Sequence, residues 1–262
     1  MHPTCKQIRR DILLASRTSG HGHIPTSFSV VEMLYATYDS MRHDPARPAW
    51  TERDIFILSK GHAALGFYCV LARAGYFPVE EVKTFGAYMS KYGCHPDRRK
   101  VPGVEVSTGS LGHGIGVAVG MSLAFKLQEN GRRVYTLVGD GEANEGSTWE
   151  AIMVAINLDL SNLTILFDFN KSQVRSLQIS NPAERLRAFG CEVFDVDGHD
   201  VSAMKAALGE KRDAVKVVVG NTMKGYGCET LEQNMFEWHR KSPDDVQLEA
   251  LLRELDRRSS GA

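Results

Sequence analysis

The sequence lacks the features that mark secreted, membrane and nucleic-acid-binding proteins. Its five cysteines are scattered, odd in number and form no CxxC pair, which argues against a disulfide framework or structural zinc and favours a reducing compartment. No apolar run approaches the roughly 20 residues that span a bilayer, and residues 1–16 have the pattern of an amphipathic helix rather than a signal peptide. A net charge of −1 gives no reason to expect binding to nucleic acid or to a membrane surface. We therefore predict a cytoplasmic protein that binds neither.

Short β-branched apolar runs alternate with longer helical patterns. The runs predict strands buried on both faces, because apolar residues continue without polar alternation. They cover residues 54–58, 134–138, 163–167 and 215–219, with a weaker candidate at 191–196. Helices are expected at residues 29–41, 62–75, 112–130, 145–158 and 201–208. This alternation predicts an α/β fold: a doubly wound, mainly parallel sheet with helices on both faces.

No internal repeat, low-complexity segment or linker divides the 262 residues. One large α/β domain reaches this length. We therefore expect a single domain over residues 1–262, with a polar, frayed tail at about 253–262.

Two polar motifs follow the second and third runs, Gly139-Asp140-Gly141 and Asp168-Phe169-Asn170. In a parallel sheet, ligands bind outside the carboxyl ends of the strands. Mg²⁺ prefers hard oxygen ligands, which Asp140, the Asn170 side chain and the Ser172 backbone carbonyl offer. The glycines beside Asp140 let a phosphate approach closely. Together the motifs predict a diphosphate site with Mg²⁺ or another divalent cation, such as Ca²⁺ or Mn²⁺.

Other interpretations compete with this one. A Gly-Asp-Gly tripeptide alone is a common turn. The glycine-rich segment at 109–116 follows no clear strand and lacks the acidic residue that a dinucleotide site needs. Six histidines lie in predicted loops, five of them beside a glycine or a proline, and none has the HxxxH spacing of a zinc site. As a set they indicate a pocket lining: His21, His23, His62, His95, His113 and His239.

The chain resembles the N-terminal, diphosphate-binding subunit of a split transketolase. The resemblance runs from the N-terminal helix to about Pro243, and it is carried by motifs in a fixed order. These are Gly22-His23-Ile24, Leu58-Ser59-Lys60-Gly61-His62-Ala63, Gly93-Cys94-His95-Pro96, residues 102–112, Gly139-Asp140-Gly141-Glu142, Glu145-Gly146, Trp149-Glu150-Ala151, Asp197-Gly198-His199-Asp200 and Trp238-His239. Each motif is weak alone, whereas the ordered set is specific.

The resemblance implies thiamine diphosphate as the cofactor and assigns roles to individual residues. Asp140, Asn170 and Ser172 are expected to hold the metal. The cofactor-binding positions are His62, Gly109, Leu111, Gly141, Glu142, Asn170 and His239. The catalytic positions are His23 and His95, which face the sugar donor, and Glu145, which belongs to a network between paired active sites. His199 is given only a structural role.

The implied reaction transfers a two-carbon ketol unit from a ketose or ketose phosphate to an aldose acceptor. The substrates would be pentose-pathway sugar phosphates or a specialised sugar. The sequence ends before a second, pyrimidine-binding domain, so we expect the chain to be inactive alone and to pair with a separate C-terminal, pyrimidine-binding subunit, in an α2β2 assembly.

Three positions depart from the family's pattern. Ile24-Pro25-Thr26-Ser27 stands where small residues are usual, and because proline fixes φ and lacks a donor we expect a reshaped wall near the donor sugar. His113 replaces a common glutamine, either as a titratable group beside the cofactor or as a plain polar substitute. Arg240 replaces a glycine and adds positive charge near the diphosphate or the entrance.

Two further functions stay open. Another thiamine diphosphate enzyme, resembling a 2-oxoacid dehydrogenase or deoxyxylulose phosphate synthase, shares the metal motif. The histidine set favours ketol transfer, because a 2-oxo acid has fewer hydroxyl groups to bind. A non-catalytic scaffold that keeps the fold is the other alternative, and the intact Asp140, Asn170 and His62 argue against it.

Overall fold

All five predicted runs form strands, and the predicted fold class is confirmed. The computed structural model describes residues 1–211 and 213–258. Within them, five strands form one parallel sheet in the order β1-β2-β3-β5-β4. Their bounds are β1 (Ile55–Leu58), β2 (Val134–Gly139), β3 (Leu163–Phe169), β4 (Glu192–Asp197) and β5 (Lys216–Asn221).

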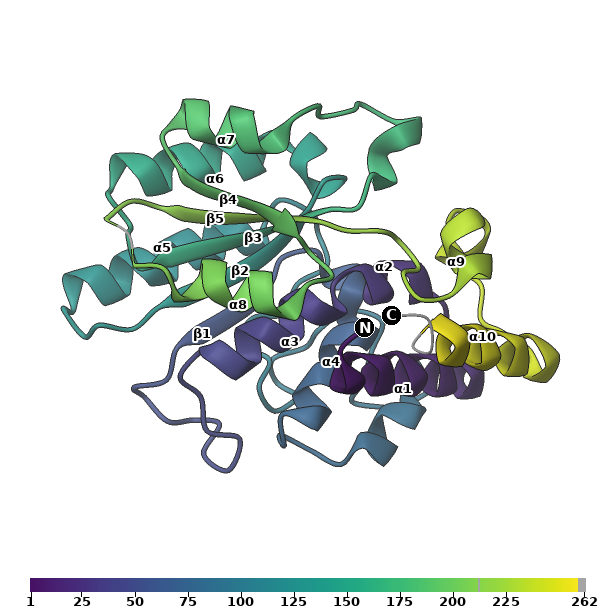
Figure 1. Ribbon diagram of the computed structural model, residues 1–262. Helices are drawn as coiled ribbons and strands as arrows, with labels where there is room; N and C mark the ends of the chain where they lie inside the picture. Colours follow the sequence, from purple (N-terminus) through teal and green to yellow (C-terminus); the bar gives the residue numbers. More distant parts are fainter. Residues whose placement is uncertain (212, 259–262) are drawn as a thin grey trace.

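Helices cover both faces of the sheet (Figure 1). One face carries α3 (Val31–Ser40), α4 (Ala64–Arg73) and α8 (Val201–Gly209), with α1 (Pro3–Ser19) packed outside them. The other face carries α5 (Gly114–Leu127), α6 (Gly146–Asn157) and α7 (Pro182–Phe189). Strand residues point alternately to the two sides, so Phe56 packs in the first apolar core and Ile55 in the second.

The remaining helices are short or peripheral. They are α2 (Ile24–Ser29), α9 (Glu229–Gln233), α10 (Asp245–Arg258), and the 3₁₀ helices η1 (Gly61–Ala63), η2 (Val79–Thr84), η3 (Glu142–Asn144), η4 (Ser172–Arg175) and η5 (Glu237–His239). The helix predicted at 29–41 therefore begins at Val31, after a separate α2. Proline is tolerated in the first helical turn, and Pro25 occupies that turn of α2.

The prediction of a frayed tail is wrong for residues 253–258. They complete α10, because Leu251 and Leu255 lie on one face of this helix and are buried, and Asp256 pairs with Lys6 and Arg10 of α1. The rest of the predicted tail, residues 259–262, lies outside the described residues. The single domain stays a prediction.

The strand register brings the two polar motifs together. Gly139 at the end of β2 lies opposite Asp168 in β3, and the next amide, of Asp140, donates to the Asp168 carbonyl over 3.1 Å. On the other side of β3, Phe169 lies opposite Asn221 at the end of β5. Side chains that follow β2, β3 and β5 therefore meet at one edge of the sheet, as expected for parallel strands.

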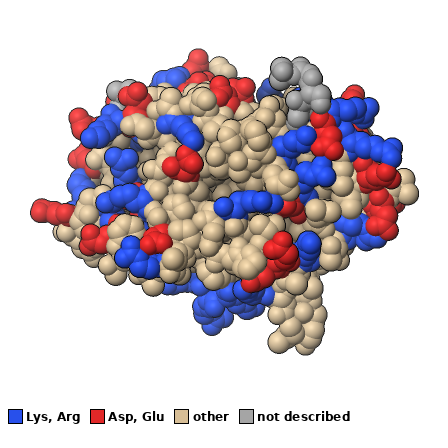
Figure 2. Space-filling model, turned by 60° about the horizontal axis from the view of Figure 1, so that its bottom comes forward, with Lys and Arg blue, Asp and Glu red and all other residues tan. Residues whose placement is uncertain are grey.

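Charges of both signs are interspersed on the surface. On the face in Figure 2, Lys and Arg side chains lie among Asp and Glu, and a group of basic side chains stands at its lower edge. The prediction that the chain binds no nucleic acid stays untested. No helix of residues 1–211 and 213–258 has the length and apolar content to cross a membrane.

Candidate active site

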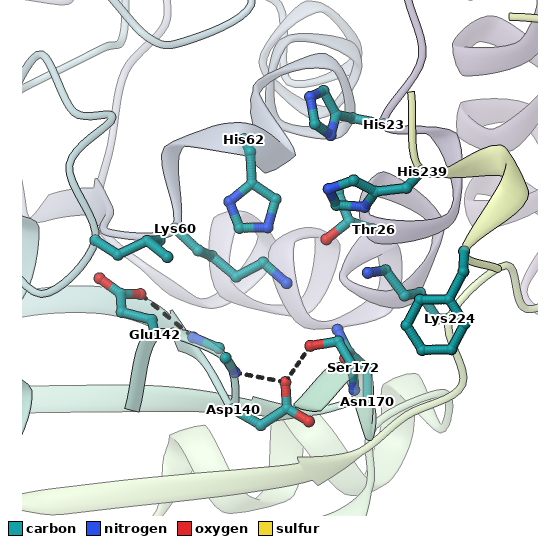
Figure 3. A pocket seen from close by; sticks show the side chains of 14 residues that line it. His23, Thr26, Lys60, His62, Asp140, Glu142, Asn170, Ser172, Lys224 and His239 are labelled. Carbon is teal, nitrogen blue, oxygen red and sulfur yellow. Dashed lines mark hydrogen bonds between the residues drawn. The ribbon is translucent and has the colours of Figure 1, made fainter. Parts of the chain in front are cut away.

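A cavity of about 430 Å³ opens at the carboxyl edge of the sheet, and Figure 3 shows its lining. It is lined by His23, Thr26, Lys60, His62, Leu111, Gly139, Asp140, Gly141, Glu142, Asn170, Ser172, Lys224, Phe236 and His239. Most of the residues that the sequence assigns to the site are therefore brought together here. Those outside the lining are His21, His95, Gly109, His113 and Glu145.

Asp140 has one carboxylate oxygen that is engaged and one that is not. Its Oδ1 accepts from the Gly141 amide at 2.7 Å and the Ser172 hydroxyl at 2.5 Å, whereas Oδ2 is buried without a partner. Burial raises the pKa of this carboxyl, although the Ser172 hydroxyl and nearby Lys60 oppose the rise. A buried carboxylate oxygen without a donor is costly unless a cation satisfies it. The site therefore fits a metal ion at Oδ2.

Asn170 is oriented by its amide group. Its Nδ2 donates to Asp168 over 2.7 Å and to the Ser29 hydroxyl over 3.3 Å, so Oδ1 faces the Ser172 amide at 2.9 Å. Asn170 and Ser172 both line the cavity, as Asp140 does. Carbonyl and carboxylate oxygens in this arrangement are the ligand types that Mg²⁺ prefers.

Asp168 lies behind the cavity and is fully satisfied. Its carboxylate accepts from Lys60, Ser29, Thr222 and Asn170 and is completely buried. Burial alone would raise its pKa, but Lys60 and the hydroxyl donors lower it below the usual value. This carboxylate therefore stays charged, and it holds the Lys60 ammonium at the cavity wall.

A second lysine, Lys224, reaches the cavity from the segment after β5. It is 5% exposed, and its ammonium forms no hydrogen bond or ion pair among the described residues, although Asp140 and Asp168 lie near enough to attract it. Burial lowers its pKa to about 8, and Lys60 adds to the shift. In Figure 3, Lys60 and Lys224 point into the space between the histidines and Asp140. Two cations at this place suit an anionic ligand.

Three histidines form a cluster at the opposite wall. The ring centroids of His23 and His239 lie 4.9 Å apart, and those of His23 and His62 lie 5.9 Å apart. Burial lowers the pKa of His23 to about 4 and that of His62 to about 2, and it also lowers that of His239, with neighbouring cations adding to each shift. All three rings are therefore neutral near pH 7. Among the described residues no His, Cys, Asp and Glu side chains gather in threes around a metal position.

Several of the unpartnered buried atoms lie in this cavity. Buried polar atoms normally have hydrogen-bond partners. A buried polar atom without a partner therefore marks a place where a ligand is expected. Three such atoms lie in the lining: Asp140 Oδ2, His23 Nδ1 and Thr26 Oγ1. His23 also adopts a left-handed backbone conformation with φ of 63°, which is uncommon for a residue other than glycine.

Glu142, a predicted cofactor-binding residue, has its carboxylate bonded within the chain. Its Oε1 accepts from the Ser59 hydroxyl at 2.5 Å and the Gly112 amide at 2.9 Å, and its Oε2 from the Gly139 amide at 3.3 Å. Burial raises its pKa, against these donors. Because both oxygens are used within the chain, Glu142 positions the loop that carries Asp140, although one side of it borders the cavity.

The predicted residues outside the lining have distinct positions. His95 is exposed, and its ring packs 3.4 Å from the place where a Cβ on Gly109 would stand. His95 is near enough to His23 to contribute to lowering its pKa. Glu145 is exposed at the start of α6, outside the lining and next to Gly112.

Sequence reasoning gave no role to Thr26, Lys60, Lys224 and Phe236. Lys60 and Lys224 follow β1 and β5, so the strand-end rule that selected Asp140 would have found them too. Thr26 belongs to the Pro25 segment, for which a reshaped wall was predicted. This segment opens α2, whose first turn presents Thr26 to the cavity.

The other two positions that depart from the family's pattern, His113 and Arg240, lie outside the cavity lining. His113 is exposed before α5 and bonds through Nδ1 to the Leu111 carbonyl at 3.0 Å, outside the lining. Arg240 is exposed beside His239, and its backbone lies so close to Gly22 that a Cβ there would come within 2.3 Å. Gly22 therefore allows the contact in which the His23 amide donates to the His239 carbonyl over 2.9 Å.

The chain is similar to known proteins. The family described as "Transketolase, thiamine diphosphate binding domain" matches residues 4–251. The chain is 40% identical to one of the subunits of the apulose-4-phosphate transketolase of Actinobacillus succinogenes over 259 residues, which cover 95% of this chain and 94% of that one. It is 37% identical to the 6-deoxy-6-sulfo-D-fructose transketolase subunit SqwG of a Clostridium species, with 87% and 86% covered.

A longer protein has the same fold over part of its length. The crystal structure of transketolase from Campylobacter jejuni superposes with a TM-score of 0.87 at 25% identity. The match covers 97% of this chain and 42% of the other, so this chain spans less than half of that transketolase. Sequence and fold agree over nearly all of the chain: it belongs to the transketolase family and corresponds to its thiamine diphosphate-binding domain.

Proposed function

We propose that this chain is the diphosphate- and Mg²⁺-binding subunit of a two-chain transketolase. The complete enzyme transfers a two-carbon ketol unit from a ketose donor to an aldose acceptor. The observation that carries the proposal is the buried, unpartnered Asp140 Oδ2 in the same cavity as two lysines and three neutral histidines. When bound, thiamine diphosphate supplies the nucleophilic carbon and the electron sink for breaking and forming C–C bonds.

In this proposal, different groups of the chain bind different parts of the cofactor. Asp140, the Asn170 side-chain oxygen and the Ser172 carbonyl hold the metal. Lys60 and Lys224 face the diphosphate oxygens, where an ammonium forms charge-assisted hydrogen bonds. The amide of Gly141, the backbone of Leu111 and the hydroxyl of Thr26 extend the same cradle, and Gly109 supports it from behind.

The histidines act on the sugar and on the cofactor. A neutral imidazole both donates and accepts, so His23 binds the sugar's hydroxyl groups, and His62 and His239 donate to the cofactor, without adding positive charge beside the lysines. His95 borders the same space from its exposed loop. We propose that His23 and His95 orient the donor's hydroxyl and carbonyl oxygens and that proton transfer passes through them.

The chain needs a pyrimidine-binding partner protein in this proposal. Relatives of matching length are named as transketolase subunits, and the Campylobacter transketolase is longer. A second copy of this chain completes an α2β2 assembly. Adjacent helices α5 and α6 expose an apolar face for it, formed by Gly116, Val117, Gly120, Met153 and Val154. Glu145 begins α6 on the exposed side, where it would meet its counterpart.

The donor is a ketose that ends in an anionic group. The names of the two relatives above specify a sugar phosphate, apulose 4-phosphate, and a sulfonated sugar, 6-deoxy-6-sulfo-D-fructose. Arg240 at the rim beside His239 is a cation that such an end group would meet. Its exposure fits a role in substrate selection better than a role in folding.

Reconstitution tests the proposal. The chain is co-expressed with its pyrimidine-binding partner protein and supplied with thiamine diphosphate, Mg²⁺, an aldose phosphate acceptor and a panel of ketose phosphates and 6-deoxy-6-sulfofructose. We expect a ketol product from the pair and none from either chain alone. Release of CO₂ from a 2-oxo acid, without ketol transfer, would show that the enzyme decarboxylates 2-oxo acids and does not catalyse the proposed reaction. No metal-dependent cofactor binding by the pair would indicate a scaffold.

A further inference from the structure

We infer that Arg9, Glu32 and His199 form a buried relay that positions Lys224 toward the diphosphate of the cofactor. The inference rests on the proposed function, because it gives Lys224 a ligand to meet. None of the three residues lines the cavity. They are therefore positioning residues, and any effect on the cofactor has to pass through the segment that carries Lys224.

The relay begins with a buried ion pair between α1 and α3. Arg9 donates from Nη1 to Glu32 Oε1 over 2.5 Å and from Nη2 to Oε2 over 2.7 Å, and both side chains are 0% exposed. Arg9 Nη2 also donates to the Phe28 carbonyl at the end of α2 over 2.8 Å. A bidentate Arg–carboxylate pair has a fixed geometry, so Glu32 Oε2 is held in one place.

His199 extends the relay to the segment after β5. Its Nδ1 lies 3.0 Å from Glu32 Oε2, and its Nε2 lies 2.8 Å from the Met223 amide nitrogen. The carboxylate requires a proton on Nδ1, and the amide donor requires a bare lone pair on Nε2. Only one neutral tautomer meets both conditions. His199 thereby links Glu32 to the backbone directly before Lys224.

Both flanks of Lys224 are held by this arrangement. On one side is the bond from the Met223 amide to His199. On the other, the Tyr226 ring stacks on the His199 ring at 3.6 Å and 9°, and the Arg9 guanidinium lies 5.1 Å above Tyr226. The Gly225 amide also donates to the Pro25 carbonyl in α2 over 3.0 Å. The backbone around Lys224 therefore has little freedom.

Such a device has a physical purpose. Lysine has a flexible four-carbon stem and loses rotamer entropy when it binds, and here no carboxylate of the described residues fixes its ammonium. Because the backbone is fixed on both sides of Lys224, less conformational entropy is lost when the side chain binds an anion. The first lysine, Lys60, is held directly by Asp168, whereas Lys224 is left open to a ligand and is directed from its backbone.

A double-mutant cycle tests the relay. The dissociation constant of thiamine diphosphate, at saturating Mg²⁺, is measured for the reconstituted pair carrying wild-type, His199→Phe, Lys224→Met or both changes. Phenylalanine keeps a ring against Tyr226 but loses both hydrogen bonds. We expect Lys224→Met to weaken binding about tenfold or more, since it removes a charge-assisted hydrogen bond. We expect His199→Phe to weaken it about threefold to tenfold, within the range of a neutral hydrogen bond.

The decisive result is the double variant. It should bind about as weakly as Lys224→Met alone, because His199 acts only through Lys224, whereas independent losses would multiply. His199→Gln, which keeps a donor and an acceptor, should restore affinity to within about threefold of wild type. If His199→Phe does not fold, His199→Asn, which keeps a donor near Glu32 but falls short of Met223, replaces it in the cycle.

A matched histidine provides the control. His43 bonds to the Tyr38 carbonyl and the Tyr76 hydroxyl and stacks on Tyr76 at 11°, but it lies away from the cavity. His43→Phe should lower the melting temperature and leave the dissociation constant unchanged. Multiplicative losses in the cycle, or normal binding by Lys224→Met, would overturn the relay while leaving the proposed function intact. Absence of binding by the wild-type pair would count against the proposed function instead.

Discussion

Replacing Asp140 with asparagine should change metal binding and folding stability in opposite directions. The substitution keeps Oδ1 and its two donors, the Gly141 amide and the Ser172 hydroxyl. It converts the unpartnered Oδ2 into a neutral amide group. A neutral group without a partner is less costly to bury than a charged one. The metal-free protein should therefore be equally stable or more stable, by about 1 kcal/mol.

The same change removes the carboxylate that we assign to the metal. We expect the affinity for thiamine diphosphate and Mg²⁺ to fall at least 100-fold, about 2.7 kcal/mol. At a cofactor concentration 100 times the wild-type dissociation constant, wild type gains about 2.7 kcal/mol and the variant about 0.4 kcal/mol. The melting temperature should then rise about 5–10 °C in wild type and about 1 °C in Asp140→Asn. Calorimetric titration and thermal unfolding, with and without a chelator, measure both effects.

Asp54 supplies a matched control, because it is a buried aspartate at the opposite end of β1. Both of its oxygens are satisfied, by Arg42 and by the Arg133 amide. Asp54→Asn should cost about 1–3 kcal/mol of stability and bind the cofactor normally. The reasoning fails if Asp140→Asn binds like wild type, or if the chelated variant is destabilised as much as Asp54→Asn.

Three further outcomes are expected. In wild type, burial lowers the pKa of His23 to about 4, so the folded protein binds a proton less readily than the unfolded chain and the free energy of unfolding falls between about pH 6.5 and pH 4. In His23→Asn, chemical unfolding should show a smaller fall over this range. Glu32→Gln should cost about 3 kcal/mol or more at pH 7, since it leaves Arg9 buried without its partner. Burial alone would raise the pKa of Glu32, but Arg9 and His199 lower it to about 2, so the difference from wild type should shrink as the pH falls from about 4.5 toward 2. If the proposed α2β2 assembly forms, Val154→Glu should convert it into smaller species in light scattering, because it places a charge on the apolar face of α6.

The strands and the metal motif were predictable because each has a local signal. Runs buried on both faces need no knowledge of distant neighbours, and all five formed strands. Asp140 and Asn170 follow adjacent strands, so the rule for parallel sheets brings them together. α10 was missed because its polar side resembled a disordered tail. Only packing against α1 shows that Leu251 and Leu255 have an apolar surface to cover.

Roles that depend on contacts between residues far apart in the chain could not be predicted from the sequence. Glu142 lies in a motif with Asp140, so the sequence suggests a shared ligand, yet its oxygens are taken by Ser59 and by two backbone amides. The neutral state of His62 follows from burial next to Lys60, which no spacing in the sequence reveals. Likewise, His199 is 167 residues from Glu32 along the chain, and only the fold makes them partners.

The two aspartates at the sheet edge explain why this cavity suits a metal diphosphate rather than a simple anion or cation. Asp168 is saturated by four donors, among them Lys60, so that pair is balanced within the protein. Of the acidic and lysine side chains that line the cavity, the ones that remain open to a ligand are Asp140, through one carboxylate oxygen, and Lys224, through its ammonium. A lone anion would satisfy only Lys224, and a lone cation only Asp140. A ligand that brings a bound cation together with phosphate oxygens satisfies both, which is the electrostatic requirement of this site.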